Sequence, residues 1–370
     1  MSRVLNIITG LGDGGAEATL CRLCCHDKEN IHFVLSLTGH GKYYSVLKDN
    51  SIHVLSVDFK KHPFVSIFHL VKAIKVIKPD VVQTWMYHAD FLGGIAARVA
   101  GIKNIYWGVH NTILEKGTSK FSTRIIAKIN AVLSGLIPKN IIYCASSSKL
   151  VHEKFGYNKQ RGLVIYNGYD LTKFKPFQSH FKISSMPNGI IKIGMVARFD
   201  PYKDHANLIE SLRLVTLHYY DILVYLVGTN IDHNNNKLLQ LIKIAGLDDK
   251  IILLGQRDDI PFFMNDIDIH VLSSSAEAFP NVLCEAMSCG IPCVTTDVGD
   301  ARYIVSDTGW IANPRDSFSL ADTICKAIFE LKYDPLSFKV RKENSVKRIA
   351  SEFTIESMVA NYSSLWGGKA

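Results

Sequence analysis

Glu277 and Glu285 lie eight residues apart with Phe-Pro between them. They follow an apolar, strand-like run at 267–272 and lead into a short stretch that ends at Gly290 and has the character of a helix. Free N–H groups at a helix N-terminus hold anions such as phosphate, and Pro280 suits the first turn of this helix. Two carboxylates beside a phosphate cradle predict a ligand that carries hydroxyls and phosphates, such as a nucleotide sugar.

A pair of cations follows another strand-like run, at 190–196. Arg198 offers a planar fork for phosphate oxygens, Lys203 offers a compact charge, and Pro201 fixes the turn between them. The arrangement predicts a diphosphate clamp. The alternative is solvated surface charge.

Two histidines also come after apolar runs, His88 after 80–84 and His110 after 103–109. Either could bind a hydroxyl or a phosphate, or move a proton near neutral pH, and the alternative is a structural histidine. The glycine-rich turn with Gly14 and Gly15 follows the first strand-like run, but it lacks the Gly-x-Gly-x-x-Gly spacing. It is either a site of close ligand approach or only a tight turn.

The chain of 370 residues is too long for one hydrophobic core, so two domains are expected. With 47% apolar and 21% charged residues it has an ordinary globular composition. No apolar run reaches the ~20 residues that span a bilayer, and residues 4–8 are too short for a signal-peptide core. A cytoplasmic protein is expected.

Charge divides unevenly along the chain. Residues 1–175 hold 23 Lys+Arg and 11 Asp+Glu, a net charge of +12, and the remainder has a net charge of −4. This asymmetry predicts an anionic partner for the first half. No nucleic-acid module is recognisable, and an anionic membrane face fits at least as well. Lys120, Arg124 and Lys128 share one face of an expected helix, which is either a lipid-docking face or an ordinary solvated one.

Short apolar runs alternate with amphipathic stretches in both halves, which is typical of βαβ units on parallel sheets. Strands are expected at 4–9, 31–37, 52–57, 80–84, 103–109, 140–145, 163–166, 190–196, 222–227, 250–254, 268–272, 292–295 and 309–311. Helices are expected at 16–26, 42–49, 64–77, 89–100, 120–134, 148–155, 204–217, 235–245, 259–265, 281–289, 299–305 and 317–331. The pattern predicts two doubly wound domains, residues 1–175 and 176–353, joined by a linker at 171–189. A last helix, 354–367, is expected to cross back to the first domain.

Taken in order, these segments resemble the retaining glycosyltransferases of family 4, which have the GT-B fold. The matching pieces are Gly14-Gly15-Ala16-Glu17, His110-Asn111, Cys144-Ala145-Ser146-Ser147, Ile165 to Asp170, Ala197-Arg198 with Lys203, and Glu277 to Glu285. The resemblance implies an α/β protein with two Rossmann-like domains that face each other across a cleft, the first binding the acceptor and the second the nucleotide-sugar donor.

The resemblance also implies roles for individual residues. Catalytic roles fall to His110, Glu277, Arg198 and Lys203. Donor binding falls to Gly14, Gly15, Arg198, Lys203, Arg257, Glu277, Phe279, Pro280, Asn281, Val282 and Glu285. His88 and Asn111 would lie on the acceptor side.

The implied reaction moves a hexose or N-acetylhexosamine from a nucleotide sugar, most simply UDP-linked, to a growing lipid-linked saccharide of an O-antigen, capsule or exopolysaccharide. No cofactor and no metal is required. Front-face attack is expected, with the leaving phosphate helping to take the acceptor proton and domain closure bringing His110 to Arg198 and Glu277. The alternatives are a nucleotide-sugar epimerase of the same fold and a nucleotide-sugar-binding protein without activity.

Overall fold

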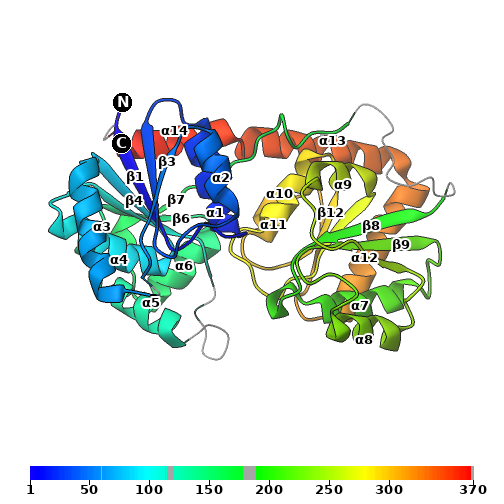
Figure 1. Ribbon diagram of the computed structural model, residues 1–370. Helices are drawn as coiled ribbons and strands as arrows, with labels where there is room; N and C mark the ends of the chain where they lie inside the picture. The colour runs from blue at the N-terminus through cyan, green and yellow to red at the C-terminus, as the bar shows by residue number, and fades with distance from the viewer. Residues whose placement is uncertain (60, 113, 115–120, 178–188, 368–370) are drawn as a thin grey trace. The chain divides into compact units, whose positions relative to one another are not determined.

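The computed structural model describes residues 1–59, 61–112, 114, 121–177 and 189–367. The chain forms two compact units: unit 1 is Met1–Gly168 with Thr354–Ala370, and unit 2 is Tyr169–Phe353 (Figure 1). The change of unit after Gly168 comes seven residues before the boundary expected from the sequence. Residues 178–188 of the expected linker, and Lys120, lie outside the described residues.

Unit 1 contains a parallel sheet whose described strands follow the order β3-β2-β1-β4-β5-β6-β7. The strands are β1 Arg3–Ile8, β2 Ile31–Ser36, β3 His53–Ser56, β4 Val81–Trp85, β5 Ile105–Val109, β6 Asn140–Tyr143 and β7 Gly162–Val164. The helices are α1 Gly15–His26, α2 Lys42–Asp49, α3 Pro63–Ile77, α4 Tyr87–Val99, α5 Phe121–Leu133, α6 Ser146–Phe155 and α14 Ile355–Trp366, with a 3₁₀ turn at Lys159–Arg161.

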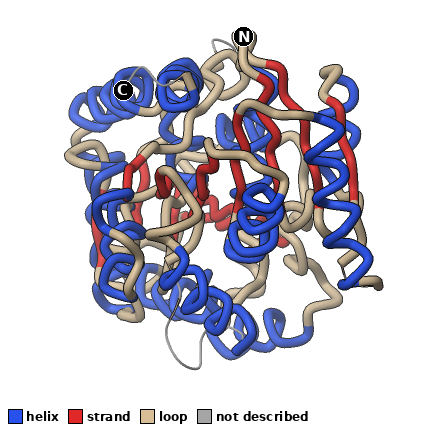
Figure 2. Tube along the Cα trace, turned by 90° about the vertical axis from the view of Figure 1, so that its left-hand side faces the viewer, coloured by secondary structure: helices blue, strands red, loops and turns tan. Residues whose placement is uncertain are grey.

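Helices cover both faces of this sheet, as Figure 2 shows. One core contains apolar residues of α3, α4 and α5, and the other contains residues of α1, α2 and α14. Strands β4 and β5 are buried along their whole length, which explains the apolar residues that both contain, and the buried polar side chains Gln83 and Thr84 of β4 donate hydrogen bonds to backbone carbonyls. The helix expected at 354–367 is therefore part of unit 1, although it follows unit 2 in the chain.

Unit 2 repeats the architecture with the strand order β10-β9-β8-β11-β12-β13, again parallel throughout the described strands. These are β8 Ile191–Val196, β9 Ile222–Val227, β10 Ile251–Leu253, β11 Ile269–Leu272, β12 Cys293–Thr296 and β13 Trp310–Ala312. The helices are α7 His205–Val215, α8 Asn236–Ala245, α9 Ile260–Asp266, α10 Asn281–Ser288, α11 Ala301–Val305, α12 Ser317–Tyr333 and α13 Pro335–Glu352, with a 3₁₀ turn at Pro201–Lys203.

The two doubly wound α/β domains predicted from the sequence are confirmed. One helix was missed: α13 has few buried side chains (Phe338, Ser345 and Ile349), so its apolar stripe is thin. Its start signal is nevertheless present, because Pro335 opens the helix and the Asp334 side chain accepts a hydrogen bond from the Ser337 N–H.

Candidate functional site

The strand order of unit 2 brings two predicted segments together. Strand β11 pairs with β8 although two other strands separate them in the sequence, so the connections after β8 and β11 leave on opposite sides. Ligands of doubly wound sheets bind outside the carboxyl ends of the strands at such a switch point. Arg198 follows β8 and Glu277 follows β11, so both predicted segments start at this point.

An ion pair joins the two segments. The Nζ atom of Lys203 lies 2.5 Å from Oε1 of Glu277, and the two side chains are 22% and 14% exposed. Ser274 donates a hydrogen bond of 2.7 Å from its hydroxyl to the same carboxylate oxygen. The structure thus confirms that these segments meet and pairs the cation directly with the carboxylate.

Backbone contacts fix the loop that carries Glu277. The Ser273 hydroxyl donates to the Lys203 carbonyl (2.8 Å), and the Ser275 N–H donates to the Tyr202 carbonyl (2.7 Å). Gly299 approaches the loop so closely that a Cβ atom there would lie 2.6 Å from the Glu277 carbonyl oxygen, and its φ is +57°. The ion pair is therefore held by a preorganised backbone.

Of the two predicted arginines of unit 2, Arg198 reaches more solvent than Lys203, whereas Arg257, with a side chain that is 23% exposed, does not. Arg198 has a side chain that is 59% exposed, and its Nε lies 3.3 Å from Oδ2 of Asp200. Arg257 donates two hydrogen bonds to the carboxylate of Asp259, at 2.8 and 2.5 Å. Neither guanidinium is locked in a buried pair, so both can turn toward an anion without breaking the core.

The sequence analysis placed Pro280 in the first turn of helix α10. The helix begins at Asn281, however, so Pro280 is its capping residue. No side chain caps this N-terminus, which is the arrangement that leaves backbone donors for an anion. Tyr169 donates a hydrogen bond from its hydroxyl to the Asn281 side-chain oxygen. Phe279 is only 6% exposed and packs edge-on against Phe353, so its ring belongs to the core rather than to a ligand surface.

The other two predicted donor residues of this segment lie on α10. Val282 is in its first turn and Glu285 is one turn further along, and both are half-buried. The helix places Glu285 beyond the uncapped end, while Glu277 precedes it on the loop. The two glutamates thus lie on either side of the uncapped N-terminus of α10.

The switch point of unit 1 lies between β1 and β4, which are paired. Gly14 is the capping residue of α1, directly after β1, and its backbone is extended, with no side chain capping the helix. A Cβ atom on Gly14 would lie 2.4 Å from Oε2 of Glu17, so a larger residue would displace that carboxylate. Gly15 is the first residue of the helix.

His88 and His110 follow the paired strands β4 and β5 and hence lie at the same edge of the sheet. His88 is in the first turn of α4, and partial burial lowers its pKa. Asn111 follows His110, and its carbonyl accepts a hydrogen bond from the Ser148 hydroxyl (2.7 Å).

His110 is stacked on the Trp85 indole, with ring centroids 5.0 Å apart. Burial lowers the pKa of His110 to about 4, and the positive charge of Arg22 adds to the effect. A ring with this pKa is neutral at pH 7 and a weak base. Hydrogen bonding to a sugar hydroxyl therefore suits His110 better than the proton transfer that the sequence analysis allowed.

Sequence reasoning missed several residues that support these sites. Ser274 holds Glu277, and Trp85 carries His110. His205 follows the Lys203 segment, is 3% exposed and lies against Phe199, with ring centroids 5.2 Å apart and the rings tilted by 46°. Ser274 and His205 adjoin recognised motifs and could have been found by position, whereas nothing in the sequence connects Trp85 to His110.

The described residues include no group of three or more His, Cys, Asp or Glu side chains placed to hold a metal ion. None of the described helices is both long enough and apolar enough to cross a membrane.

Comparison with protein families identifies both units. Residues 3–173 match the model "Glycosyltransferase Family 4", and residues 177–333 match "Glycosyl transferases group 1". The chain belongs to the family 4 glycosyltransferases. The expected enzyme class is thus confirmed, and the epimerase and the inactive binding protein are set aside.

Relatives with curated names cover most of the glycosyltransferase. An Escherichia coli UDP-Gal:alpha-D-GlcNAc-diphosphoundecaprenol alpha-1,3-galactosyltransferase is 26% identical over 81% of this chain and 78% of its own length. A Campylobacter jejuni N,N'-diacetylbacillosaminyl-diphospho-undecaprenol alpha-1,3-N-acetylgalactosaminyltransferase is 24% identical over 79% of this chain and 80% of its own length.

The fold of the glycosyltransferase is that of solved GT-B enzymes. HepE of Anabaena, crystallised with UDP and glucose, superposes with a TM-score of 0.87 over 100% of both chains at 21% identity. Similarity at this level of identity establishes the fold, and the expected GT-B class is confirmed.

Proposed function

We propose that this enzyme transfers a hexose or N-acetylhexosamine from a UDP-sugar, with retention of configuration, to a growing lipid-linked saccharide. The observation that carries the donor assignment is the Lys203–Glu277 pair at the β8–β11 switch point, in the segment that leads to the uncapped N-terminus of α10. Cation, carboxylate and free backbone donors are the three groups that a diphosphate joined to a sugar requires. Unit 2 is accordingly proposed as the donor domain and unit 1 as the acceptor domain.

Breaking the sugar–phosphate bond leaves negative charge on the diphosphate. Preorganised donors stabilise such charge most when they need no rearrangement, and the loop contacts of Lys203 provide that condition. Arg198, Arg257 and the first N–H groups of α10 complete the proposed anion site of unit 2, and Gly14 and Gly15 of unit 1 stay proposed donor-binding residues. With these cations present, we propose that neither metal nor cofactor is needed.

Retention through a covalent intermediate would require an unengaged carboxylate beside the anomeric carbon. Glu277 already accepts hydrogen bonds from Lys203 and Ser274. A carboxylate in that state is a poor nucleophile and a good acceptor for sugar hydroxyls. This supports front-face attack, with Glu277 and His110 binding the sugar, Glu285 binding the ribose, and the leaving phosphate taking the acceptor proton.

The printed names of two relatives support the acceptor class. Both act on sugars joined to undecaprenol through a diphosphate. A saccharide on such a carrier, in O-antigen, capsule or exopolysaccharide assembly, is our proposal for this enzyme, with His88 and Asn111 on the acceptor side.

The donor proposal is tested by incubating the purified enzyme with UDP-glucose, UDP-galactose and their N-acetyl forms, together with lipid-linked saccharides extracted from cells. We expect UDP release and labelled lipid-linked product with one of the donors, an α-anomeric product by NMR, and an unchanged rate when EDTA is added. Absence of transfer from all four UDP-sugars, alongside transfer from a GDP- or dTDP-sugar, would refute the UDP assignment. A β-anomeric product would refute retention.

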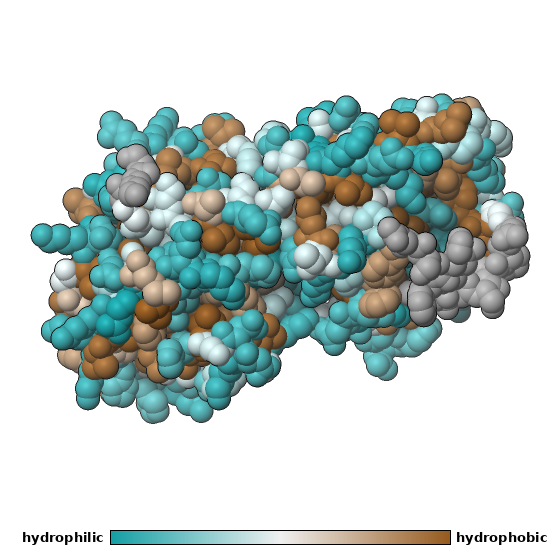
Figure 3. All heavy atoms as spheres, turned by 90° about the horizontal axis from the view of Figure 1, so that it is seen from above, coloured by the Kyte–Doolittle hydropathy of each residue, from teal (hydrophilic) through white to brown (hydrophobic). Residues whose placement is uncertain are grey.

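Unit 1 carries a surface that fits the proposed lipid-linked acceptor. A groove of about 430 Å³ lies between α3 and α4, with apolar lining that includes Phe68, Val76 and Val99 and with Lys72 and Lys75 among its lining residues. These three apolar side chains are 65–74% exposed. Isolated exposed apolar residues are ordinary, as Figure 3 illustrates on another side of the molecule, but a lined groove is not.

Charge indicates what this groove would contact. Helix α4 packs against both α3 and α5, and the three helices contain one acidic residue, Asp90, which is fully buried. Exposed apolar residues continue along α5 to Val132, at 77% exposure. An apolar face with lysines and without exposed acids favours an anionic bilayer, and we propose that α3, α4 and α5 form this docking face at the cytoplasmic side of the membrane.

Lys72→Glu combined with Lys75→Glu is expected to weaken binding to phosphatidylcholine vesicles that contain about one-third phosphatidylglycerol by at least about 30-fold, because each lysine contributes about 1 kcal/mol and each new glutamate is repelled by the anionic lipid. Co-sedimentation measures this. The matched control is Lys339→Glu with Lys347→Glu on α13, which reverses two exposed lysines outside the proposed docking face. Equal vesicle binding by the α3 variant and by the wild type would refute the proposed docking face.

A further inference from the structure

The ring of His110 lies on a buried platform. Its partner, the Trp85 indole, is 0% exposed, ends β4, and also stacks on Tyr362 of α14 at 5.9 Å with an interplanar angle of 24°. The orientation of the indole therefore determines where the His110 ring can lie.

A chain of hydrogen bonds holds this indole. The Trp85 Nε1–H can only donate, and it donates to Oδ1 of Asn6 at 3.1 Å. The amide of Asn6 must then present its NH₂ group to Nδ1 of His32, 3.1 Å away. Because Nδ1 accepts, the ring proton of neutral His32 sits on Nε2 and is donated to Oδ2 of Asp27 at 3.0 Å.

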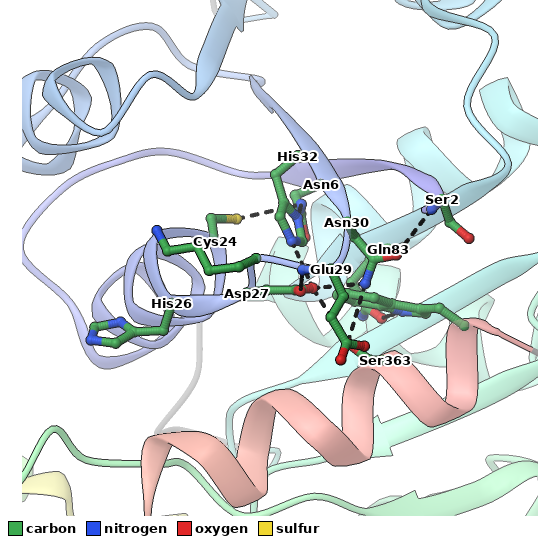
Figure 4. Close-up of polar contacts among 12 residues, drawn as sticks. Ser2, Asn6, Cys24, His26, Asp27, Glu29, Asn30, His32, Gln83 and Ser363 are labelled. Carbon is green, nitrogen blue, oxygen red and sulfur yellow. Dashed lines mark hydrogen bonds and ion pairs between the residues drawn. The ribbon is translucent and has the colours of Figure 1, made fainter.

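The chain ends on a carboxylate that is firmly ionised. Burial alone would raise the Asp27 pKa, but hydrogen bonds from His32, Asn30 and the Glu29 N–H outweigh it and lower the pKa to about 2. Figure 4 shows these side chains converging between α1, β1 and β2. The donor and acceptor of each hydrogen bond in this chain are thus fixed by the two end groups. The indole at one end can only donate, and the carboxylate at the other end can only accept.

Helix α14 adds contacts at three points of the same chain. The Ser363 hydroxyl donates to Asp27 (3.4 Å) and accepts from Asn30 (3.1 Å), as Figure 4 shows. Trp366 lies edge-on to His32 at 5.7 Å, and Tyr362 stacks on Trp85. Through these contacts, helix α14 helps to hold the Trp85 indole and the residues of the hydrogen-bond chain in place.

The backbone next to Trp85 is strained. Met86 has φ +75° and ψ 156°, a conformation that costs of order 1–3 kcal/mol for a residue with a side chain. Its N–H donates to the Gly108 carbonyl at 2.8 Å, two residues before His110. A strained backbone of this kind persists only where surrounding contacts hold it in place. Here those contacts come from the ends of β4 and β5, the two strands that precede the stacked rings.

We propose that Asn6 is a positioning residue for His110, acting through the Trp85 indole and anchored by His32, Asp27 and α14. The proposal rests on the proposed function in one respect, that His110 contacts the sugar during transfer. Breaking the chain leaves a buried N–H without a partner, which costs about 1–3 kcal/mol and is relieved by rotation of the indole. The His110 ring then loses its fixed position.

The first variant is Asn6→Leu, which removes both links of the amide. We expect kcat for transfer to fall by about 100-fold, the effect of a displacement near 1 Å, with a smaller change in the donor KM. Asn6→Asp is the rescue variant. Its carboxylate still accepts from Trp85, and His32 can regain the second link by taking a proton and donating from both nitrogens, so kcat should stay within about 10-fold of wild type.

A second readout does not depend on activity. By NMR the His110 imidazole of the folded wild type should stay neutral from pH 7 down to about pH 5.5, since burial and Arg22 both lower its pKa to about 4. In Asn6→Leu the exposed ring should titrate closer to the ordinary 6.5. Asn130→Leu is the matched control, because Asn130 is also a fully buried, hydrogen-bonded asparagine of unit 1. It should leave the His110 titration unchanged.

Each outcome separates the two proposals. A wild-type His110 titration in Asn6→Leu, or an equal shift in Asn130→Leu, would overturn the positioning role. Two results together would support the positioning role of Asn6 and reject the proposed function. These are a shifted His110 titration in Asn6→Leu and no transfer by the wild type from any nucleotide sugar. Should Asn6→Leu fail to fold, Trp85→Phe removes the N–H and keeps a ring over His110, and it should move the titration in the same direction.

Discussion

Lys203→Ala is expected to lower kcat for sugar transfer by about 100- to 1000-fold, the usual effect of removing one preorganised donor from a developing anion. Its Nζ atom is the cation at the β8–β11 switch point, held 2.5 Å from Glu277. Initial rates of UDP release under saturating donor would measure the effect, and circular dichroism would show whether the fold is retained.

The same substitution should also reduce stability, because it leaves the Glu277 carboxylate, 14% exposed, without its cation. The double variant Lys203→Met with Glu277→Gln removes both charges. We expect it to unfold at a higher urea concentration than Lys203→Ala while remaining inactive. This separation of stability from activity is what a functional pair predicts.

The pair Lys326–Asp322 on α12 provides the control. It has a similar separation, 2.6 Å, but both side chains are 63% exposed. Lys326→Ala should change the free energy of unfolding by less than about 1 kcal/mol and leave kcat unchanged. Near wild-type turnover by Lys203→Ala would show that the proposed donor site is wrong.

Mild acid is expected to destabilise the protein steeply. His152, His205 and His270 are 0–3% exposed. Burial lowers the pKa of His152 and His205 to about 4 and that of His270 to about 3. Unfolded histidines bind a proton near pH 6.5, so between these values the unfolded chain holds more protons. The stabilisation is complete above pH 6.5 and is lost as pH falls toward 4.

Each histidine should contribute about 1 kcal/mol per pH unit in this window, so His205 and His270, both in unit 2, should together remove about 3 kcal/mol of the stability of that unit by about pH 5. Urea unfolding at pH 7, 6 and 5 measures the slope. His270→Asn is the informative variant, because neither ring nitrogen of His270 has a hydrogen-bond partner among the described residues. It should make the slope for unit 2 shallower by about one half, and an unchanged slope would rule out His270 as a contributor.

The pattern of apolar runs predicted most of the fold, because fully buried parallel strands such as β4 and β5 have few alternatives. It failed at α13, where burial of few residues leaves little periodicity to detect. The segments of the proposed donor site were also chosen from the sequence, since glycine, proline and charged residues follow strands in a recognisable order.

The pairing of these residues could not be predicted in the same way. Lys203 and Glu277 are 74 residues apart, and they meet only because β11 inserts beside β8. Asn6, His32 and Trp85 lie on three strands whose adjacency is a property of the strand order. Sequence patterns describe which residue ends each strand, but which strands become neighbours depends on packing across the whole unit.

The placement of α14 affects how the protein is made. Its residues Ile355, Met358 and Tyr362 complete a core of unit 1, yet the ribosome synthesises them only after all of Tyr169–Phe353. At roughly 5–20 residues per second, one apolar face of unit 1 stays uncovered on the nascent chain for roughly 10–40 s. During that interval the uncovered face is a target for chaperones and for aggregation, so slower translation of unit 2 should lower the yield of native enzyme.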